Sequence, residues 1–201
     1  MTTVSPFPSI DFALESDLTE VWSIYDYYVR HSVATFAYVT PSPEQLRSEW
    51  QRLHPFYPYL VGRWKGAVIG YAYAHPHSPR AAYQWTVELS IYLAPEYRGK
   101  GWGRRLYCCL IDLLRAQGVV NAYVCITHPN PISEQFHHRL GFTPLSLWPK
   151  AGYKDGRWLD VTWMQLTLNP HPDRPEPPCA VSALPPDLVL GLLSRHNNVT
   201  P

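Results

Sequence analysis

A short glycine-rich and basic stretch has the composition of an anion-binding turn. It consists of Arg98, Gly99, Lys100, Gly101, Trp102, Gly103 and Arg104, and Arg105 adds a further positive charge. Glycines let a ligand approach the backbone closely, and the first N–H groups of a helix have no partner within that helix. A helical pattern begins at Trp102. We expect residues 98–104 to bind a phosphate or pyrophosphate.

Two common phosphate motifs do not match this turn. A Walker loop requires Ser or Thr after its Gly-Lys pair, but Gly101 follows Lys100. The dinucleotide fingerprint requires a third glycine or alanine at the position that Leu106 occupies. The pattern that remains is Arg-x-x-Gly-x-Gly, entered from a strand and followed by a helix. That context favours a binding site over the alternative, a basic and solvated turn.

Glu88 lies a few residues before the turn, on a predicted strand. Apolar Val87, Leu89, Ile91 and Leu93 alternate there with Glu88, Ser90 and Tyr92, which is the period of a half-buried strand. A carboxylate beside an anion site can act as a general base, directly or through a water. Backbone N–H groups of Ile91–Leu93 can hold a carbonyl oxygen on which negative charge develops. The alternative for Glu88 is a solvated glutamate at a sheet edge.

A second polar group follows a predicted strand at 119–127. Asn130 and Ser133 stand at the start of a short predicted helix over 131–140, and His137 lies within it. Histidine exchanges protons at neutral pH because its ordinary pKa lies near 6.5. The alternative is that His137 is a surface residue beside His138.

The elements that must position these residues follow from periodicity and helix-start signals. Strands are expected at 9–14, 58–64, 67–75, 84–94, 119–127, 142–148 and 158–168, and helices at 17–31, 42–53, 102–117 and 131–140. Asp17 with Glu20, and Ser42 with Gln45, have the spacing of helix N-caps. This mixed order favours one α/β domain built on a single sheet.

Length and composition limit the classes of protein. The 201 residues are enough for one well-cored domain, and the net charge of +1 argues against a nucleic-acid partner. The chain has neither a signal segment nor an apolar run of membrane-spanning length, so we expect a cytoplasmic protein without a membrane partner. His75-Pro-His77 lacks a third ligand and the four cysteines lack metal spacing, so no metal site is expected.

The composition changes after Leu168, which makes 9–168 the expected domain and 169–201 a tail. Eight of the 21 prolines lie in the last 32 residues, so 170–186 is expected to be extended or disordered. An apolar segment at 187–195 can form a short helix that docks on the body or on a partner. The alternative is an unstructured tail.

Several separated motifs resemble the GNAT superfamily of N-acetyltransferases, and within it the phosphinothricin N-acetyltransferase branch. They are residues 81–88, the turn at 98–104, the run from Asn130 through His137 to Leu140-Gly-Phe142, and residues 151–161. The resemblance covers roughly residues 9–168. It implies a GNAT fold with a central, mostly antiparallel sheet flanked by helices, acetyl-CoA as co-substrate, and a homodimer. The implied acceptor is a small amino acid or an analogue such as phosphinothricin or methionine sulfoximine, whose amine attacks the thioester directly.

The resemblance also assigns roles to residues. It makes Glu88 and His137 the acid/base pair, adds Ser90, Ile91, Tyr92, Leu93, Asn130 and Ser133 to the coenzyme contacts, and lines the acceptor pocket with Phe36, Arg80, Tyr83, Val87 and Leu89. Two positions depart from the herbicide-resistance enzymes, since Ser78 replaces a lysine and Ala37 an arginine. Arg80 can still pair with a carboxylate through two hydrogen bonds. An acceptor with fewer negative charges than phosphinothricin is therefore expected.

Two other functions stay open at this point. The altered pocket at Ala37 and Ser78, together with the tail, is compatible with an acetyl-CoA-binding or interaction module that no longer turns over. Acetylation of a protein amino terminus would require an open peptide groove. A screen of amine substrates separates these alternatives.

Overall fold

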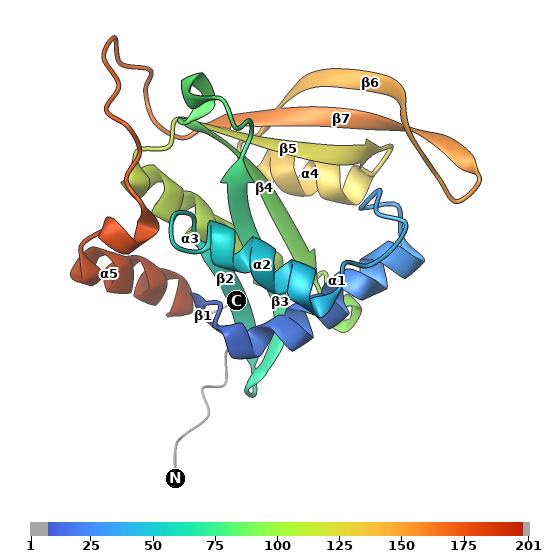
Figure 1. The fold of residues 1–201 in the computed structure, drawn as a ribbon, viewed down its shortest axis with the longest axis horizontal. Helices are drawn as coiled ribbons and strands as arrows, with labels where there is room; N and C mark the ends of the chain where they lie inside the picture. The colour runs from blue at the N-terminus through green and yellow to red at the C-terminus, as the bar shows by residue number, and fades with distance from the viewer. Residues whose placement is uncertain (1–7, 199–201) are drawn as a thin grey trace.

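Seven strands form one sheet in the order β1-β2-β3-β4-β5-β7-β6 in the computed structural model, which describes residues 8–198 (Figure 1). The strands are β1 (Ser9–Phe12), β2 (Tyr59–Trp64), β3 (Ala67–Pro76), β4 (Thr86–Leu93), β5 (Asn121–His128), β6 (Thr143–Lys154) and β7 (Arg157–Thr167). Every neighbouring pair is antiparallel except β4 and β5, which are parallel. The mostly antiparallel α/β sheet expected from the sequence is confirmed.

Helices cover both faces of this sheet. They are α1 (Leu18–His31), α2 (Pro43–Leu53), α3 (Trp102–Gln117), α4 (Pro131–Arg139) and α5 (Pro186–Asn197). Figure 1 shows α1 and α2 in front of the sheet and α3 behind it. Alternation along β2 explains the two layers, because Val61 packs in the α1–α2 core while Leu60 packs in the α3 core. None of the helices in the described part of the chain is long and apolar enough to cross a membrane.

The predicted start of α2 is confirmed in its details. The Ser42 hydroxyl accepts from the Gln45 N–H at 3.2 Å, and the Gln45 side-chain oxygen accepts from the Ser42 N–H at 2.8 Å. This reciprocal pair satisfies two N–H groups that the helix itself cannot satisfy.

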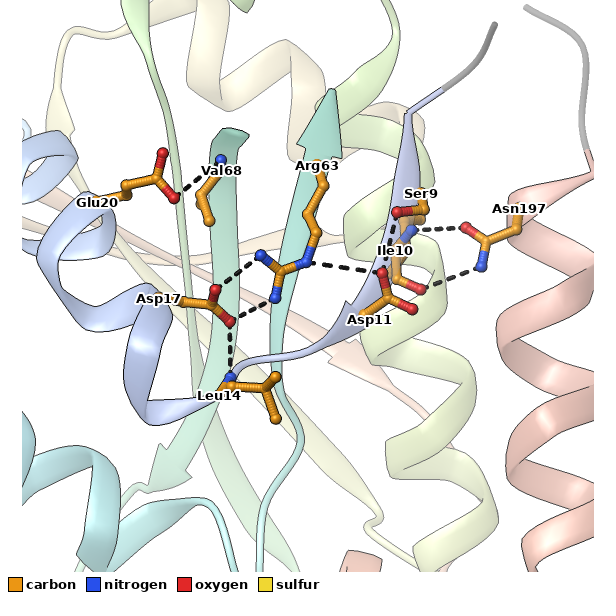
Figure 2. Close-up of polar contacts among 9 residues, drawn as sticks. All are labelled: Ser9, Ile10, Asp11, Leu14, Asp17, Glu20, Arg63, Val68 and Asn197. Atoms are coloured by element: carbon orange, nitrogen blue, oxygen red, sulfur yellow. Dashed lines mark hydrogen bonds and ion pairs between the residues drawn. The ribbon is translucent and has the colours of Figure 1, made fainter. Parts of the chain in front are cut away.

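Asp17 is the N-cap residue of α1 as predicted, but its side chain makes no cap hydrogen bond because it has a different partner. Arg63 on β2 donates to both Asp17 carboxylate oxygens, at 2.7 and 2.5 Å, and the Leu14 N–H donates at 2.7 Å (Figure 2). Glu20 accepts from the Val68 N–H on β3 at 3.3 Å. Burial opposes ionisation of Asp17, but the hydrogen bonds from Arg63 and Leu14 outweigh it and lower its pKa. These side chains tie the start of α1 to the sheet instead of capping it.

The tail is folded onto the body, so its unstructured alternative is wrong for residues 169–198. At the end of α3, the Gln117 amide donates to the carbonyl of Phe56 and to that of Cys179 in the first part of the tail, at 2.7 and 2.8 Å. At the other end of the tail, Asn197 bonds both backbone groups of Ile10, which joins α5 to β1 (Figure 2). Leu192 on α5 is buried in the core cluster that contains α3. The proline-rich connection is extended but anchored at both ends.

The β6–β7 hairpin is longer than the sequence pattern predicts. β6 continues past Trp148 to Lys154 and turns at Asp155-Gly156, where both residues have positive φ (50° and 76°), as a two-residue hairpin turn requires. A register shift between Trp148 and Gly152 breaks the alternation, so the pattern of the sequence ends there.

Candidate active site

The parallel strands β4 and β5 pair over three residues and then diverge. Their register joins Thr86, Val87 and Glu88 to Asn121, Ala122 and Tyr123. Both strands continue, β4 to Leu93 and β5 to His128, without further pairing between them. Glu88 therefore stands where the opening between the two strands begins.

Backbone groups of β4 face this opening. The Ala94 N–H donates to the Ile69 carbonyl on β3 at 2.9 Å. The backbone N–H and C=O groups of consecutive residues in a strand point alternately to its two neighbouring strands. Leu93 and Ile91 therefore direct their N–H groups toward β5. The Tyr28 hydroxyl engages both backbone groups of Leu93: it donates to the carbonyl at 2.8 Å and accepts from the N–H at 3.3 Å. Ile91 is left as the main backbone contact for a ligand between the strands.

Ser90 and Tyr92 take a different position from the one expected of coenzyme contacts. By the same alternation their backbone groups point to β3, where they pair with Tyr73 and Tyr71. The Tyr92 ring packs edge-on against Tyr28 on α1, with 4.9 Å between ring centroids. Neither residue directs its backbone into the opening.

The glycine-rich turn joins β4 to α3 as the sequence predicts. Gly101 has φ 80° and directly precedes the helix, a conformation that a side chain would strain. A Cβ on Gly103 would lie 3.0 Å from the Leu93 side chain, so a larger residue here would have to push the end of that side chain aside. The first helical bond runs from the Arg105 N–H to the Gly101 carbonyl. The N–H groups of residues 102–104 therefore have no partner within the helix, and they fit an anion.

The basic side chains of the turn divide into two groups. The Arg98 guanidinium lies over the Tyr28 ring, 4.7 Å from its centroid. Arg104 is exposed at the helix start. Arg105, however, donates to the carbonyls of His196 (3.0 Å) and Asn197 (3.2 Å) on the tail. Its expected contribution to the anion site is wrong, because it anchors α5.

Asn130 caps α4 at the end of β5. Its side-chain oxygen accepts from the Ser133 N–H at 3.1 Å, and the Asn130 N–H donates to Glu134 at 2.7 Å. The amide NH₂ of Asn130 is the part of the side chain that this cap does not use. It can donate to an extended ligand that follows β4 and β5.

His137 is buried, contrary to a role as a histidine that titrates near neutral pH. Its side chain is 5% exposed and packs against Tyr107 and Phe142. Nδ1 donates to the Ser133 carbonyl at 2.8 Å, so Nε2 is left to accept from the Tyr107 hydroxyl at 3.3 Å. Burial lowers the pKa of His137 to about 4, so the ring is neutral at pH 7. Both ring nitrogens are engaged within the core.

Glu88 contacts His77, a residue that the sequence pattern marked only as part of a rejected metal motif. Its Oε1 lies 2.7 Å from Nδ1 of His77, and the two side chains are 21% and 29% exposed. His77 directly follows β3, and its N–H donates to the Thr86 carbonyl on β4. The spacing of 11 residues in the chain carries no signal for this contact. Only the pairing of β3 with β4 brings the two side chains together.

Aromatic rings enclose the His77–Glu88 pair. Tyr83, Tyr123 and Trp163 meet the imidazole edge-on, with ring centroids 5.7, 5.2 and 6.1 Å away. The expected pocket residue Tyr83 is thus beside Glu88. Arg80 is exposed and directly precedes the short helix that carries Tyr83.

The other expected pocket residues have different surroundings. Phe36 packs against Gly152 on the extension of β6. Val87 and Leu89 are buried in the core cluster that contains α3, on the face of β4 opposite to Glu88. Their assignment to the acceptor pocket is wrong for their side chains, because a strand directs neighbouring side chains to opposite faces.

Comparison with known proteins identifies the family. Residues 15–142 match the acetyltransferase (GNAT) family. A phosphinothricin N-acetyltransferase of Streptomyces viridochromogenes is 35% identical over 83% of this chain and 91% of the relative. An L-methionine sulfoximine/L-methionine sulfone acetyltransferase of Salmonella typhimurium is 37% identical over 81% and 96%. The chain belongs to the GNAT family of acetyltransferases.

The fold agrees with this membership. The crystal structure of a GNAT phosphinothricin acetyltransferase from Sinorhizobium meliloti in complex with acetyl-CoA has a TM-score of 0.82 and 36% identity, covering 88% of this chain and 97% of that one. A GNAT enzyme transfers an acetyl group, and the diverging β4–β5 pair and the turn before α3 are the parts of this chain suited to that task.

Proposed function

We propose that this protein is an acetyl-CoA-dependent N-acetyltransferase that acetylates the amine of a small amino acid or amino-acid analogue. The observation that carries the proposal is the position of Glu88 at the closed end of the β4–β5 opening, directly ahead of the anion-binding turn. The two curated relatives named above act on phosphinothricin and on methionine sulfoximine or sulfone. These acceptors are amino-acid analogues, which supports the same class here.

The residues of the opening fit acetyl-CoA, which supplies the acetyl group as a thioester. The N–H groups at the start of α3, with Arg98, Lys100 and Arg104, would hold the pyrophosphate. The backbone of Ile91 and the amide of Asn130 would hold the extended arm. The carbonyl oxygen of the thioester needs a hydrogen-bond donor as charge develops on it, and the Ile91 N–H is positioned on the correct strand.

The acceptor side of the site fits a monoanionic amino acid. Arg80 carries the positive charge for the carboxylate, and Tyr83 forms the wall beside Glu88. Glu88 supplies the negative charge that favours removal of the amine proton. Ser78 and Ala37 offer no positive charge to a second anionic group on the acceptor. An acceptor with an uncharged side chain, such as methionine sulfoximine, is therefore favoured over phosphinothricin. His137 is not assigned a proton-transfer role, because it is neutral and bonded through both nitrogens.

A substrate screen tests the proposal. Amino acids, their sulfoximine and phosphinate analogues, simple amines and short peptides are incubated with the protein and acetyl-CoA, and the released thiol is measured. We expect turnover with a small α-amino acid or analogue. Coenzyme binding without turnover on any amine would instead identify a binding module, and turnover confined to peptides would identify an amino-terminal acetyltransferase.

We also propose that the protein is a cytoplasmic homodimer that pairs through the edge of the sheet at β6. Leu145, Leu147 and Trp148 on this edge strand are 50%, 50% and 52% exposed. An apolar edge strand of this kind is a surface on which a second copy can pack. Light scattering should give twice the chain mass, and Leu147→Lys should give the monomer mass. A monomeric wild-type protein at micromolar concentration would reject the dimer.

A further inference from the structure

We infer that His77 is the group that takes the proton from the acceptor amine, with Glu88 as the carboxylate that orients it. The inference deepens the proposed acetyl transfer and rests on it. An ionised carboxylate only accepts hydrogen bonds, so the 2.7 Å contact requires a proton on Nδ1 of His77. In a neutral ring the lone pair is then on Nε2.

The geometry is that of an orienting carboxylate and a basic imidazole. Within residues 8–198, Nε2 of His77 has no hydrogen-bond partner, whereas Glu88 already uses one oxygen on Nδ1. An ordinary imidazole is a stronger base than an ordinary carboxylate by about two pKa units. Glu88 then stabilises the imidazolium that forms.

The surroundings of the ring restrict where it can act. Tyr83, Tyr123 and Trp163 enclose it edge-on, so the ring keeps one orientation. The groups around the His77–Glu88 pair that can carry charge include His75 on β3 and the hydroxyls of Tyr83 and Tyr123. They also include the thiol of Cys125 on β5, whose pKa burial and the charge of Glu88 raise to about 11. His75 is directly opposite Glu88 in the strand register, yet its Nδ1 is directed to the Pro76 carbonyl at 3.2 Å. Of the two histidines, only His77 is bonded to the carboxylate.

His77 can act in both proton transfers of the reaction, first as base and then as acid. The amine nitrogen forms a bond to the acetyl carbon, the carbon–sulfur bond breaks, and its electron pair leaves with the sulfur. The proton of the amine passes to Nε2, and the imidazolium can return it to the departing sulfur. This sequence supplies the acid that buried His137 does not provide, and it needs no additional reactant.

His77→Asn is the decisive variant. Its amide keeps an N–H donor near the position of Nδ1, so it can still orient Glu88, but it cannot accept a proton. We expect kcat to fall by about 100-fold or more, with the Kd for acetyl-CoA within twofold of wild type. The acidic limb of the profile of kcat/KM against pH should also disappear. His75→Asn, the matched control two residues earlier at the end of β3, should stay within threefold of wild type in kcat.

A second variant separates the loss of the base from a structural disturbance caused by the substitution. His77→Ala opens a space beside Glu88, and added imidazole should restore part of the lost kcat. The inference is overturned if His77→Asn keeps wild-type kcat and pH profile, because the ring would then only orient Glu88. It is also overturned if imidazole restores nothing in a folded His77→Ala protein. A wild-type protein that binds acetyl-CoA but acetylates no amine rejects the proposed function itself and the inference with it.

Discussion

Gly152 on β6 lies directly against the ring of Phe36. A Cβ at Gly152 would come within 2.1 Å of the ring carbon Cε2 and 2.4 Å of Cδ2, closer than any side chain tolerates. The loop that carries Phe36 is held by the same hairpin, because the Lys154 ammonium donates to the carbonyls of Val29 (2.9 Å), Ser32 (2.9 Å) and Thr35 (2.8 Å). The β6 extension therefore decides where the Phe36 ring lies.

The first prediction concerns this contact. Gly152→Ala should displace the Phe36 ring and raise the KM for the acceptor severalfold, while the Kd for acetyl-CoA stays unchanged. Steady-state kinetics with the acceptor found in the screen checks it. Gly191→Ala on α5 is the matched control, since no atom lies within 4 Å of its added methyl group and the change should leave both constants unaltered. An unchanged acceptor KM in Gly152→Ala would remove Phe36 from the pocket.

The second prediction separates two neighbouring arginines. Arg98→Ala should weaken acetyl-CoA binding roughly tenfold, as loss of one charge-assisted hydrogen bond implies. Arg105→Ala should leave that Kd within twofold, but it should make the tail more sensitive to proteolysis, because Arg105 holds the carbonyls at the end of α5. Isothermal titration and limited proteolysis measure the two effects. Equal losses of coenzyme affinity in both variants would contradict the division of the basic cluster.

The third prediction follows from the buried His137. Its pKa in the folded chain is about 4, below the ordinary 6.5, so the unfolded chain binds a proton here that the folded chain excludes. The free energy of unfolding should therefore fall as the pH drops from 6.5 toward 4, by at most roughly 3 kcal/mol from this residue.

Urea unfolding of wild type and His137→Gln between pH 7 and pH 4.5 isolates this contribution. The amide of Gln stays neutral throughout, so the variant should lose less stability over this interval than wild type. Identical slopes in the two proteins would show that His137 is accessible to protons in the folded state.

The fourth prediction concerns the attachment of α1 to the sheet. Asp17→Asn leaves Arg63 without its main carboxylate partner and should lower the free energy of unfolding at pH 7 by about 2 kcal/mol or more. Because the pKa of Asp17 is lowered on folding, its contribution is present above its ordinary pKa of 3.8 and is lost as the pH falls below it. Asp11→Asn is the control, since Asp11 is 3.8 Å from Arg63 and half exposed. Equal losses in both variants would contradict the prediction.

The local elements could be predicted from the sequence because their signals lie within a few residues. The start of α3 at Trp102, the reciprocal cap of Ser42 and Gln45, and the glycine turn follow from periodicity, cap chemistry and positive φ. The anion-binding turn and the position of Glu88 on a strand ahead of it follow from the same short-range order. The motifs at these positions were also enough to indicate the family.

The partners of the functional side chains were decided by the tertiary structure. The contact of His77 with Glu88 depends on the pairing of β3 with β4, and the neutral state of His137 depends on Tyr107 and Phe142 closing over it. Arg105 points away from the anion site because it donates to the carbonyl of His196, which is 91 residues further along the chain. Periodicity states which face of an element is buried. It cannot state which residue from a distant part of the chain packs there. The identity of that partner determines the protonation and the orientation of each functional side chain.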